Sequence, residues 1–107
     1  MLPLASVEAQ RVCPECGRVM QSAPLDWLAQ QKANTAARLG IKNHVGGSLG
    51  GATAEGVGWA STPQRAIQRC CFSGHPLQSK RGPYKTRLGT AVARGNDGYW
   101  YACILVR

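Results

Sequence analysis

Two cysteines near the start of the chain, Cys13 and Cys16, have the spacing of half a zinc site. Thiolates at positions i and i+3, followed by a glycine that lets backbone amides turn toward sulfur, are typical of zinc knuckles. Tetrahedral coordination needs two further ligands, and Cys71 (or Cys70) with His75 would provide them. The alternative is a turn whose thiols are free or oxidised. Zinc is therefore a candidate cofactor that the spacing allows but does not require.

Two histidines and one acidic residue form a second candidate set. His44, Glu55 and His75 each lie next to a glycine or close to one, in the central part of the chain. Two imidazoles and a carboxylate can hold a divalent metal ion or transfer protons in acid–base catalysis. Spacing alone does not bring the three together, so unrelated polar positions remain the alternative.

A third candidate is a cluster of four cations within eight residues, Lys80, Arg81, Lys85 and Arg87, with Tyr84 among them. Cations can bind phosphates, and an interleaved aromatic ring suits stacking on a nucleic-acid base. The alternative is a solvated loop. The whole chain has 13 Lys and Arg against 5 Asp and Glu, a formal net charge of +8. This balance favours nucleic acid or another polyanion as a partner without choosing between them.

Two helices are predicted around these residues. Between 25 and 39, apolar residues recur at intervals of three and four, while Lys32 and other polar residues occupy the remaining positions. Gly40 then ends the helix. A second helix is expected from Thr62, a hydroxyl N-cap followed by proline, to about residue 72.

The stretch 40–58 contains seven of the chain's thirteen glycines and predicts a tight, winding loop. Its Gly-Gly-Ser-Leu-Gly-Gly run lacks the following Gly-Lys-Ser/Thr of a nucleotide-binding loop. Strands are expected at 88–94 and 99–107, joined by a Gly-Asn-Asp-Gly turn as a hairpin. The second strand is almost continuously apolar, which predicts that both its faces are covered.

These elements predict an α/β fold, a small α-β-α sandwich with a C-terminal antiparallel hairpin. A lead-in of residues 1–24 carries the cysteine pair, and residues 25–107 form one domain. The chain has no stretch of about 20 apolar residues, which a membrane-spanning helix requires. The start of the sequence lacks the charge and apolar pattern of a secretory signal. We therefore expect a cytoplasmic or virion protein with reduced thiols, and a buried Cys103.

Several segments in order give the chain a resemblance to a known family. A helix precedes His44, a Glu-Gly-Val-Gly-Trp segment begins at Glu55, Phe-Ser-Gly-His ends at His75, and Leu-Gly-Thr-Ala-Val-Ala-Arg-Gly precedes Tyr-Trp-Tyr. Together, over residues 25–107, they resemble the CAP superfamily (cysteine-rich secretory proteins, antigen 5 and pathogenesis-related proteins), in its short prokaryotic form. The resemblance implies an α-β-α sandwich whose cleft of two His and two Glu can hold a divalent metal.

The resemblance implies that His44, Glu55 and His75 are cleft residues. The family's second Glu has no counterpart here, since its position falls in Arg-Cys-Cys-Phe, and the Asn after the first Glu is Gly56. The leading hypothesis is therefore a non-catalytic CAP-like binding or assembly module with protein partners, for example a component of a virion or phage. The alternatives are a basic zinc-knuckle protein that binds nucleic acid, and a metal-dependent hydrolase that uses the His/Glu cleft.

Overall fold

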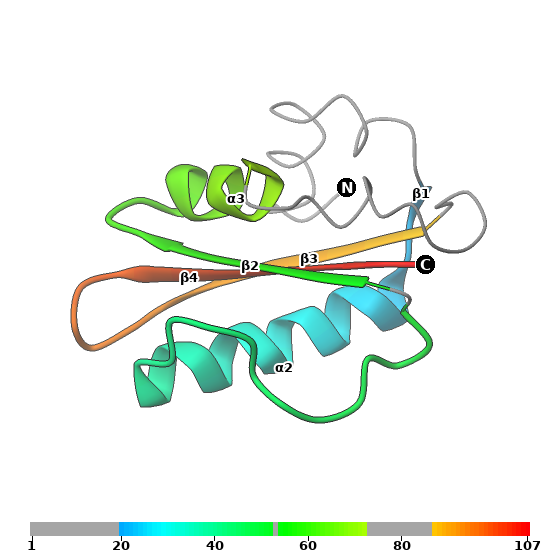
Figure 1. The fold of residues 1–107 in the computed structure, drawn as a ribbon, viewed down its shortest axis with the longest axis horizontal. Helices are drawn as coiled ribbons and strands as arrows, with labels where there is room; N and C mark the ends of the chain where they lie inside the picture. Colours follow the sequence, from blue (N-terminus) through cyan, green and yellow to red (C-terminus); the bar gives the residue numbers. More distant parts are fainter. Residues whose placement is uncertain (1–19, 53, 73–86) are drawn as a thin grey trace.

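The computed structural model describes residues 20–52, 54–72 and 87–107. They form one four-stranded sheet in the order β1-β3-β4-β2, with β1 parallel to β3 and the other neighbours antiparallel. One helix lies on each face of this sheet (Figure 1). The α-β-α sandwich and the C-terminal hairpin predicted from the sequence are confirmed. In chain order the elements are β1 (Met20–Gln21), α2 (Ala23–Leu39), β2 (Ala54–Ala60), α3 (Pro63–Phe72), β3 (Arg87–Arg94) and β4 (Trp100–Val106).

Helix α2 begins two residues earlier than predicted because Ser22 caps it. The Ser22 hydroxyl accepts a hydrogen bond from the Leu25 amide. The proline in the first turn has no backbone N–H, so it needs no acceptor there. The helix ends at Gly40, whose φ of 66° lies in the left-handed region and whose N–H donates to the Ala36 carbonyl. Strand β1 and the first turn of α2 therefore occupy positions where the sequence pattern showed no periodic structure.

Strand β4 is the central strand and forms the core of the molecule. It pairs with β3 on one side and β2 on the other, and every residue from Tyr101 to Val106 is buried. Alternate side chains pack against α3 on one face and α2 on the other. Burial of each leucine, isoleucine or valine stabilises the fold by about 1.5–3 kcal/mol. The prediction that both faces of this strand are covered is confirmed.

The prediction of a winding loop over 40–58 is wrong for its last part, because Ala54–Ala60 forms strand β2. Glycine and alanine at positions 56, 58 and 60 are buried. A Cβ atom at Gly58 would lie 2.2 Å from the Ala66 carbonyl oxygen of α3. Gly58 therefore allows α3 to pack closely against β2 and is not part of a turn. Left-handed φ angles occur earlier in the segment, at Gly47, Gly50 and Gly51.

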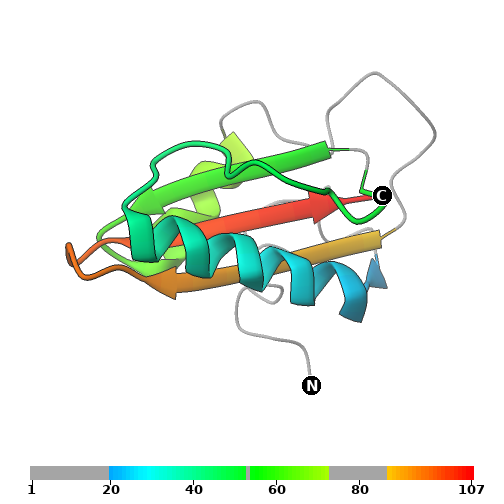
Figure 2. The ribbon, with the colours of Figure 1, turned by 90° about the horizontal axis from the view of Figure 1, so that it is seen from below.

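β3 and β2 lie on opposite sides of β4 (Figure 2), and their hydrogen-bond partners differ. Along the edge of β3, the short strand β1 pairs with its start. Farther along, the Asp26 carboxylate accepts a hydrogen bond from the Thr90 N–H at 2.9 Å, and the Gln30 amide donates to the Val92 carbonyl at 3.0 Å. No comparable bond from any described residue reaches the outer edge of β2.

Candidate functional site

Two of the three predicted cleft residues meet at the start of β2. His44 comes from the loop after α2, and its Nδ1 lies 2.6 Å from Oε1 of Glu55. The Glu55 side chain is 6% exposed, whereas that of His44 is 57% exposed. The imidazole therefore covers a buried carboxylate from the solvent side.

The other oxygen of Glu55 is paired with a buried lysine from α2. Lys32 Nζ lies 3.2 Å from Glu55 Oε2 and also donates to the Val45 carbonyl at 3.1 Å. Its side chain is only 7% exposed, so its assignment to the polar side of the helix was wrong. Lys32 follows Leu25 and Ala29 at the spacing of the apolar face. That spacing is the signal that could have identified it.

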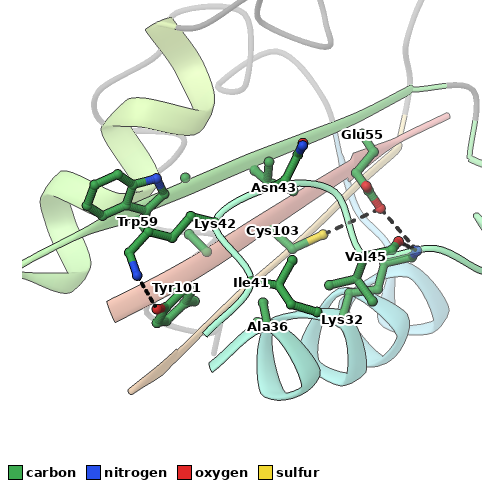
Figure 3. A pocket seen from close by; sticks show the side chains of 14 residues that line it. Lys32, Ala36, Ile41, Lys42, Asn43, Val45, Glu55, Trp59, Tyr101 and Cys103 are labelled. Carbon is green, nitrogen blue, oxygen red and sulfur yellow. Dashed lines mark hydrogen bonds and ion pairs between the residues drawn. The ribbon is translucent and has the colours of Figure 1, made fainter. Parts of the chain in front are cut away.

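A buried thiol completes this cluster (Figure 3). Cys103 is 2% exposed, as predicted, and its Sγ lies 4.0 Å from Glu55 Oε2. Burial raises the pKa of the Cys103 thiol well above its ordinary value; the Glu55 charge also raises it, and Lys32 opposes the change. A thiol with a raised pKa is a poor nucleophile at neutral pH.

The surroundings of Glu55 do not suit a divalent cation. Both carboxylate oxygens already have partners, and the nearest cation is the Lys32 ammonium group, which would repel a metal ion at that oxygen. The cavity that Glu55 and Cys103 line has a volume of about 10 Å³, roughly the room that one water molecule needs. Within the described ranges, no three His, Cys, Asp or Glu side chains are grouped as metal ligands would be.

The remaining predicted site residues lie outside the part of the chain that the structure describes. This holds for His75, for Cys13 and Cys16, and for the cations Lys80, Arg81 and Lys85. Cys71 lies in α3 and Arg87 begins β3, but their side chains are not among those described. The zinc and anion sites therefore stay predictions.

Sequence reasoning missed a second cluster, in which a lysine ammonium group lies among aromatic rings. Lys42 Nζ is 5.3 Å from the ring centre of Trp59, 5.2 Å from that of Tyr99 and 5.6 Å from that of Tyr101. It also lies 3.2 Å from the Tyr101 hydroxyl and 3.4 Å from the Asp97 carboxylate. These distances are in the range of cation–π contacts. The rings come from two strands and a turn, so no local motif signals the cluster.

The ionisable groups of this cluster influence one another. The hydrogen bond with Tyr101 raises the pKa of Lys42 and lowers that of Asp97, which also accepts from the Tyr99 amide. Burial raises the pKa of the Tyr101 hydroxyl, and its hydrogen bond to Asp97 adds to this effect. The hydroxyl therefore stays protonated at neutral pH and can donate to Asp97.

A second cation lies against the same tryptophan. The Arg69 guanidinium, from α3, is 5.1 Å from the Trp59 ring centre. Trp59 also makes an edge-to-face contact with Tyr99, with ring centres 5.4 Å apart. The end of β2 therefore carries an aromatic ring that contacts one cation from α3 and one from the loop after α2.

No helix in the described ranges is long and apolar enough to cross a bilayer. The described geometry thus comprises a closed ion-pair cluster at the start of β2 and an aromatic cluster with two cations at its end. The chain matches no family model, and no curated protein matches it.

Proposed function

We propose that this protein is a non-catalytic, CAP-like binding module that acts by contact with a protein partner in a larger assembly, such as a virion or phage particle. The observation that carries the proposal is the internal pairing of Glu55. Its two oxygens bind His44 and Lys32, at 2.6 and 3.2 Å. A carboxylate held in this way stabilises the fold rather than activating a water molecule.

The small size of the adjoining cavity supports the same conclusion. Binding pockets for small molecules have volumes of roughly 300–1,000 Å³. The cavity beside Glu55 measures about 10 Å³. A substrate would have to displace Val45, Trp59 or other lining residues to reach the carboxylate.

The sandwich and the His44–Glu55 contact agree with what the CAP resemblance implies. Lys32 marks the difference, because its ammonium group stands beside the carboxylate where a metal ion would need space. A buried carboxylate needs a positive partner to remain ionised, and Lys32 is that partner here.

Metal addition tests the proposal. Because residues 13 and 16 could bind zinc separately, the parent protein carries Cys13→Ser and Cys16→Ser. We compare this parent with a variant that also carries His44→Asn. We expect Zn²⁺, Mn²⁺ or Mg²⁺ to shift the melting temperature of the two proteins by the same amount. The proposal is wrong if a metal-dependent stabilisation, or a metal-dependent hydrolysis of a nitrophenyl ester, disappears with His44→Asn.

Nucleic-acid binding is the second candidate function, favoured by the two cations on Trp59 and the net charge of +8. Stacking of a base on Trp59 would require the Lys42 or Arg69 contact to open. Fluorescence anisotropy with labelled oligothymidine tests it. Nucleic-acid binding predicts an affinity that falls steeply with salt and drops with Arg69→Ala. Our leading proposal predicts no binding at physiological salt.

A further inference from the structure

A second cavity lies beside the end of β3, where the last turns of α2 come close to the hairpin turn (Figure 2). Its volume is about 260 Å³, against about 10 Å³ for the cavity that Glu55 lines. Binding pockets for small molecules measure roughly 300–1,000 Å³, so this cavity suits a small ligand. It is lined by six residues, of which the four polar ones are exposed: Asn34, Ala37, Arg38, Ala93, Arg94 and Asn96.

Polar side chains of α2 follow the edge of β3 at intervals of four residues. Asp26 accepts a hydrogen bond from the Thr90 N–H at 2.9 Å, and Gln30 donates to the Val92 carbonyl at 3.0 Å. Asn34 is the next residue in this series, and it lines the cavity. Its side-chain oxygen accepts from Gln30 at 2.8 Å, which leaves its NH₂ group without a protein partner among the described residues.

The backbone of Arg94 faces the same side of the strand as that of Thr90 and Val92. Hydrogen-bonded and non-hydrogen-bonded pairs alternate along an antiparallel ladder. The Gly95 N–H donates to the Tyr99 carbonyl at 2.8 Å, so the preceding residue directs its N–H and C=O away from β4. Because Arg94 lines the cavity, its N–H is a further donor at the cavity wall.

The charge beside the cavity is positive. Arg38 forms no ion pair with any described residue, and none of the lining residues carries a carboxylate. Asp97, which follows the lining residues in the hairpin turn, is already paired with Lys42. A guanidinium group has five N–H donors and no acceptor. With the NH₂ group of Asn34 and the Arg94 N–H, it gives the cavity a set of donors and a positive charge.

We propose that this cavity binds a small oxyanion, the phosphate or carboxylate group of a small molecule. The inference goes beyond the proposed function, because it involves neither Glu55 nor a protein partner. A guanidinium group binds phosphates and carboxylates through paired hydrogen bonds, which are stronger than bonds between neutral groups. Arg38 also lies in the last turn of α2, where a cation stabilises the helix dipole. Its roles in the helix and in the cavity can be separated by experiment.

Binding is measured by nuclear magnetic resonance on the full, isotope-labelled chain. Glycerol phosphate and succinate are the two probes, and they carry a phosphate and two carboxylate groups respectively; glycerol is the uncharged control. We expect the anions to shift the Arg94 backbone amide signal and the Asn34 side-chain NH₂ signal in a saturable way. Glycerol, and sodium chloride at the same ionic strength, should leave both signals unchanged. The probe that binds more tightly identifies the preferred anionic group.

Matched variants separate the cavity from the net charge of the protein. Arg38→Gln should weaken binding of the tighter probe about tenfold, because it removes hydrogen bonds from a charged donor. Arg65→Gln removes the same charge at an exposed position of α3, on the opposite face of the sheet, and should leave the affinity nearly unchanged. Asn34→Ala keeps the net charge and should weaken binding severalfold.

The inference is overturned if neither anion shifts the Arg94 and Asn34 signals, or if sodium chloride shifts them equally. It is also overturned if Arg38→Gln lowers the melting temperature but leaves binding unchanged, since the arginine would then act only on the helix. Equal effects of Arg38→Gln and Arg65→Gln would indicate attraction by net charge alone. Tighter binding of oligothymidine than of either probe at these signals would assign the cavity to nucleic acid instead. None of these outcomes depends on the metal test, so the two proposals can fail separately.

Discussion

At the residue scale, the most consequential feature is the chain of contacts from Lys32 through Glu55 to His44. The lysine and the glutamate are almost completely buried, while the histidine is largely exposed. Burial removes water from both charges, so each depends on its partner much more than a surface ion pair would. These contacts give each oxygen of the Glu55 carboxylate a partner of its own.

Removal of Lys32 should therefore be costly. We expect Lys32→Met to lower the free energy of unfolding by about 3 kcal/mol, because it leaves Glu55 buried without its ammonium partner. His44→Ala should cost less than about 1 kcal/mol, since that imidazole is mostly in water. Urea denaturation measures both values. If Lys32→Met costs no more than His44→Ala, the buried pair does not contribute as described.

The Tyr101 hydroxyl gives a prediction about alkaline pH. Its pKa is raised above 10.0 in the folded protein, mainly by burial. A raised pKa gives stability that is complete below pH 10 and is lost as pH rises through the folded value. The pKa of Lys42, raised above 10.5, acts in the same direction.

Replacing the hydroxyl tests this account. Tyr101→Phe keeps the buried ring but removes the titrating group and its bonds to Asp97 and Lys42. In urea denaturations from neutral pH to about pH 11, the advantage of the wild type over Tyr101→Phe should shrink above pH 10. A constant or growing difference would show that the hydroxyl does not titrate as expected.

Asp97 affects stability at acid pH instead. Its pKa in the folded protein lies below 3.8, so the stability that the ionised carboxylate contributes is lost only as pH falls through that region.

At the scale of elements, two glycines let the helices approach the sheet. Gly58 of β2 faces α3, and Gly89 of β3 faces α2, where a Cβ would lie 2.2 Å from the Leu25 carbonyl carbon. Real Cβ atoms do not approach backbone this closely. Each helix is therefore positioned by the absence of a side chain on the strand beneath it.

Adding one methyl group at this contact should displace α3. We expect Gly58→Ala to cost about 1–3 kcal/mol, because the new Cβ would lie 2.2 Å from the Ala66 oxygen and 2.9 Å from the Cys70 nitrogen. Gly46→Ala is the matched control, since nothing lies within 4 Å of its added Cβ. Thermal unfolding compares the two variants. Equal melting temperatures would contradict the close packing of α3 on β2.

At the scale of the whole molecule, the sheet separates two apolar layers, and among the described side chains each layer contains one buried cysteine. Cys70 packs between α3 and the sheet, and Cys103 packs beneath α2. The two residues are 0% and 2% exposed. Reaction at either sulfur therefore requires the corresponding layer to open.

Alkylation of these thiols should report on the opening of each layer. We expect iodoacetamide to modify Cys70 and Cys103 at least a hundredfold more slowly in the native protein than in urea, with sites assigned by mass spectrometry. Burial of both thiols and the raised pKa of Cys103 are the causes. Native modification of Cys103 at the unfolded rate would show that α2 does not cover the sheet. A difference between the two rates would show that the layers open separately.

Features encoded by neighbouring residues were predictable from the sequence by itself. The Thr62-Pro63 cap fixes the start of α3, the apolar run fixes β4 as the covered central strand, and the turn ending at Gly98 fixes the hairpin. Each depends on backbone preferences or solvent exclusion over a few residues. The sequence therefore determined the two helices and the C-terminal hairpin, with small errors at their ends, but it missed strands β1 and β2.

Features that depend on distant partners were decided only by the tertiary structure. From the sequence alone, the glycines of β2 predicted a loop and Lys32 predicted a solvent-exposed position. Only the structure shows that Gly58 packs against α3 and that Lys32 pairs with Glu55. The Lys42 cluster joins a loop to two strands and a turn. Charge pairing and close packing act between residues that are neighbours in space, so local periodicity carries little information about them.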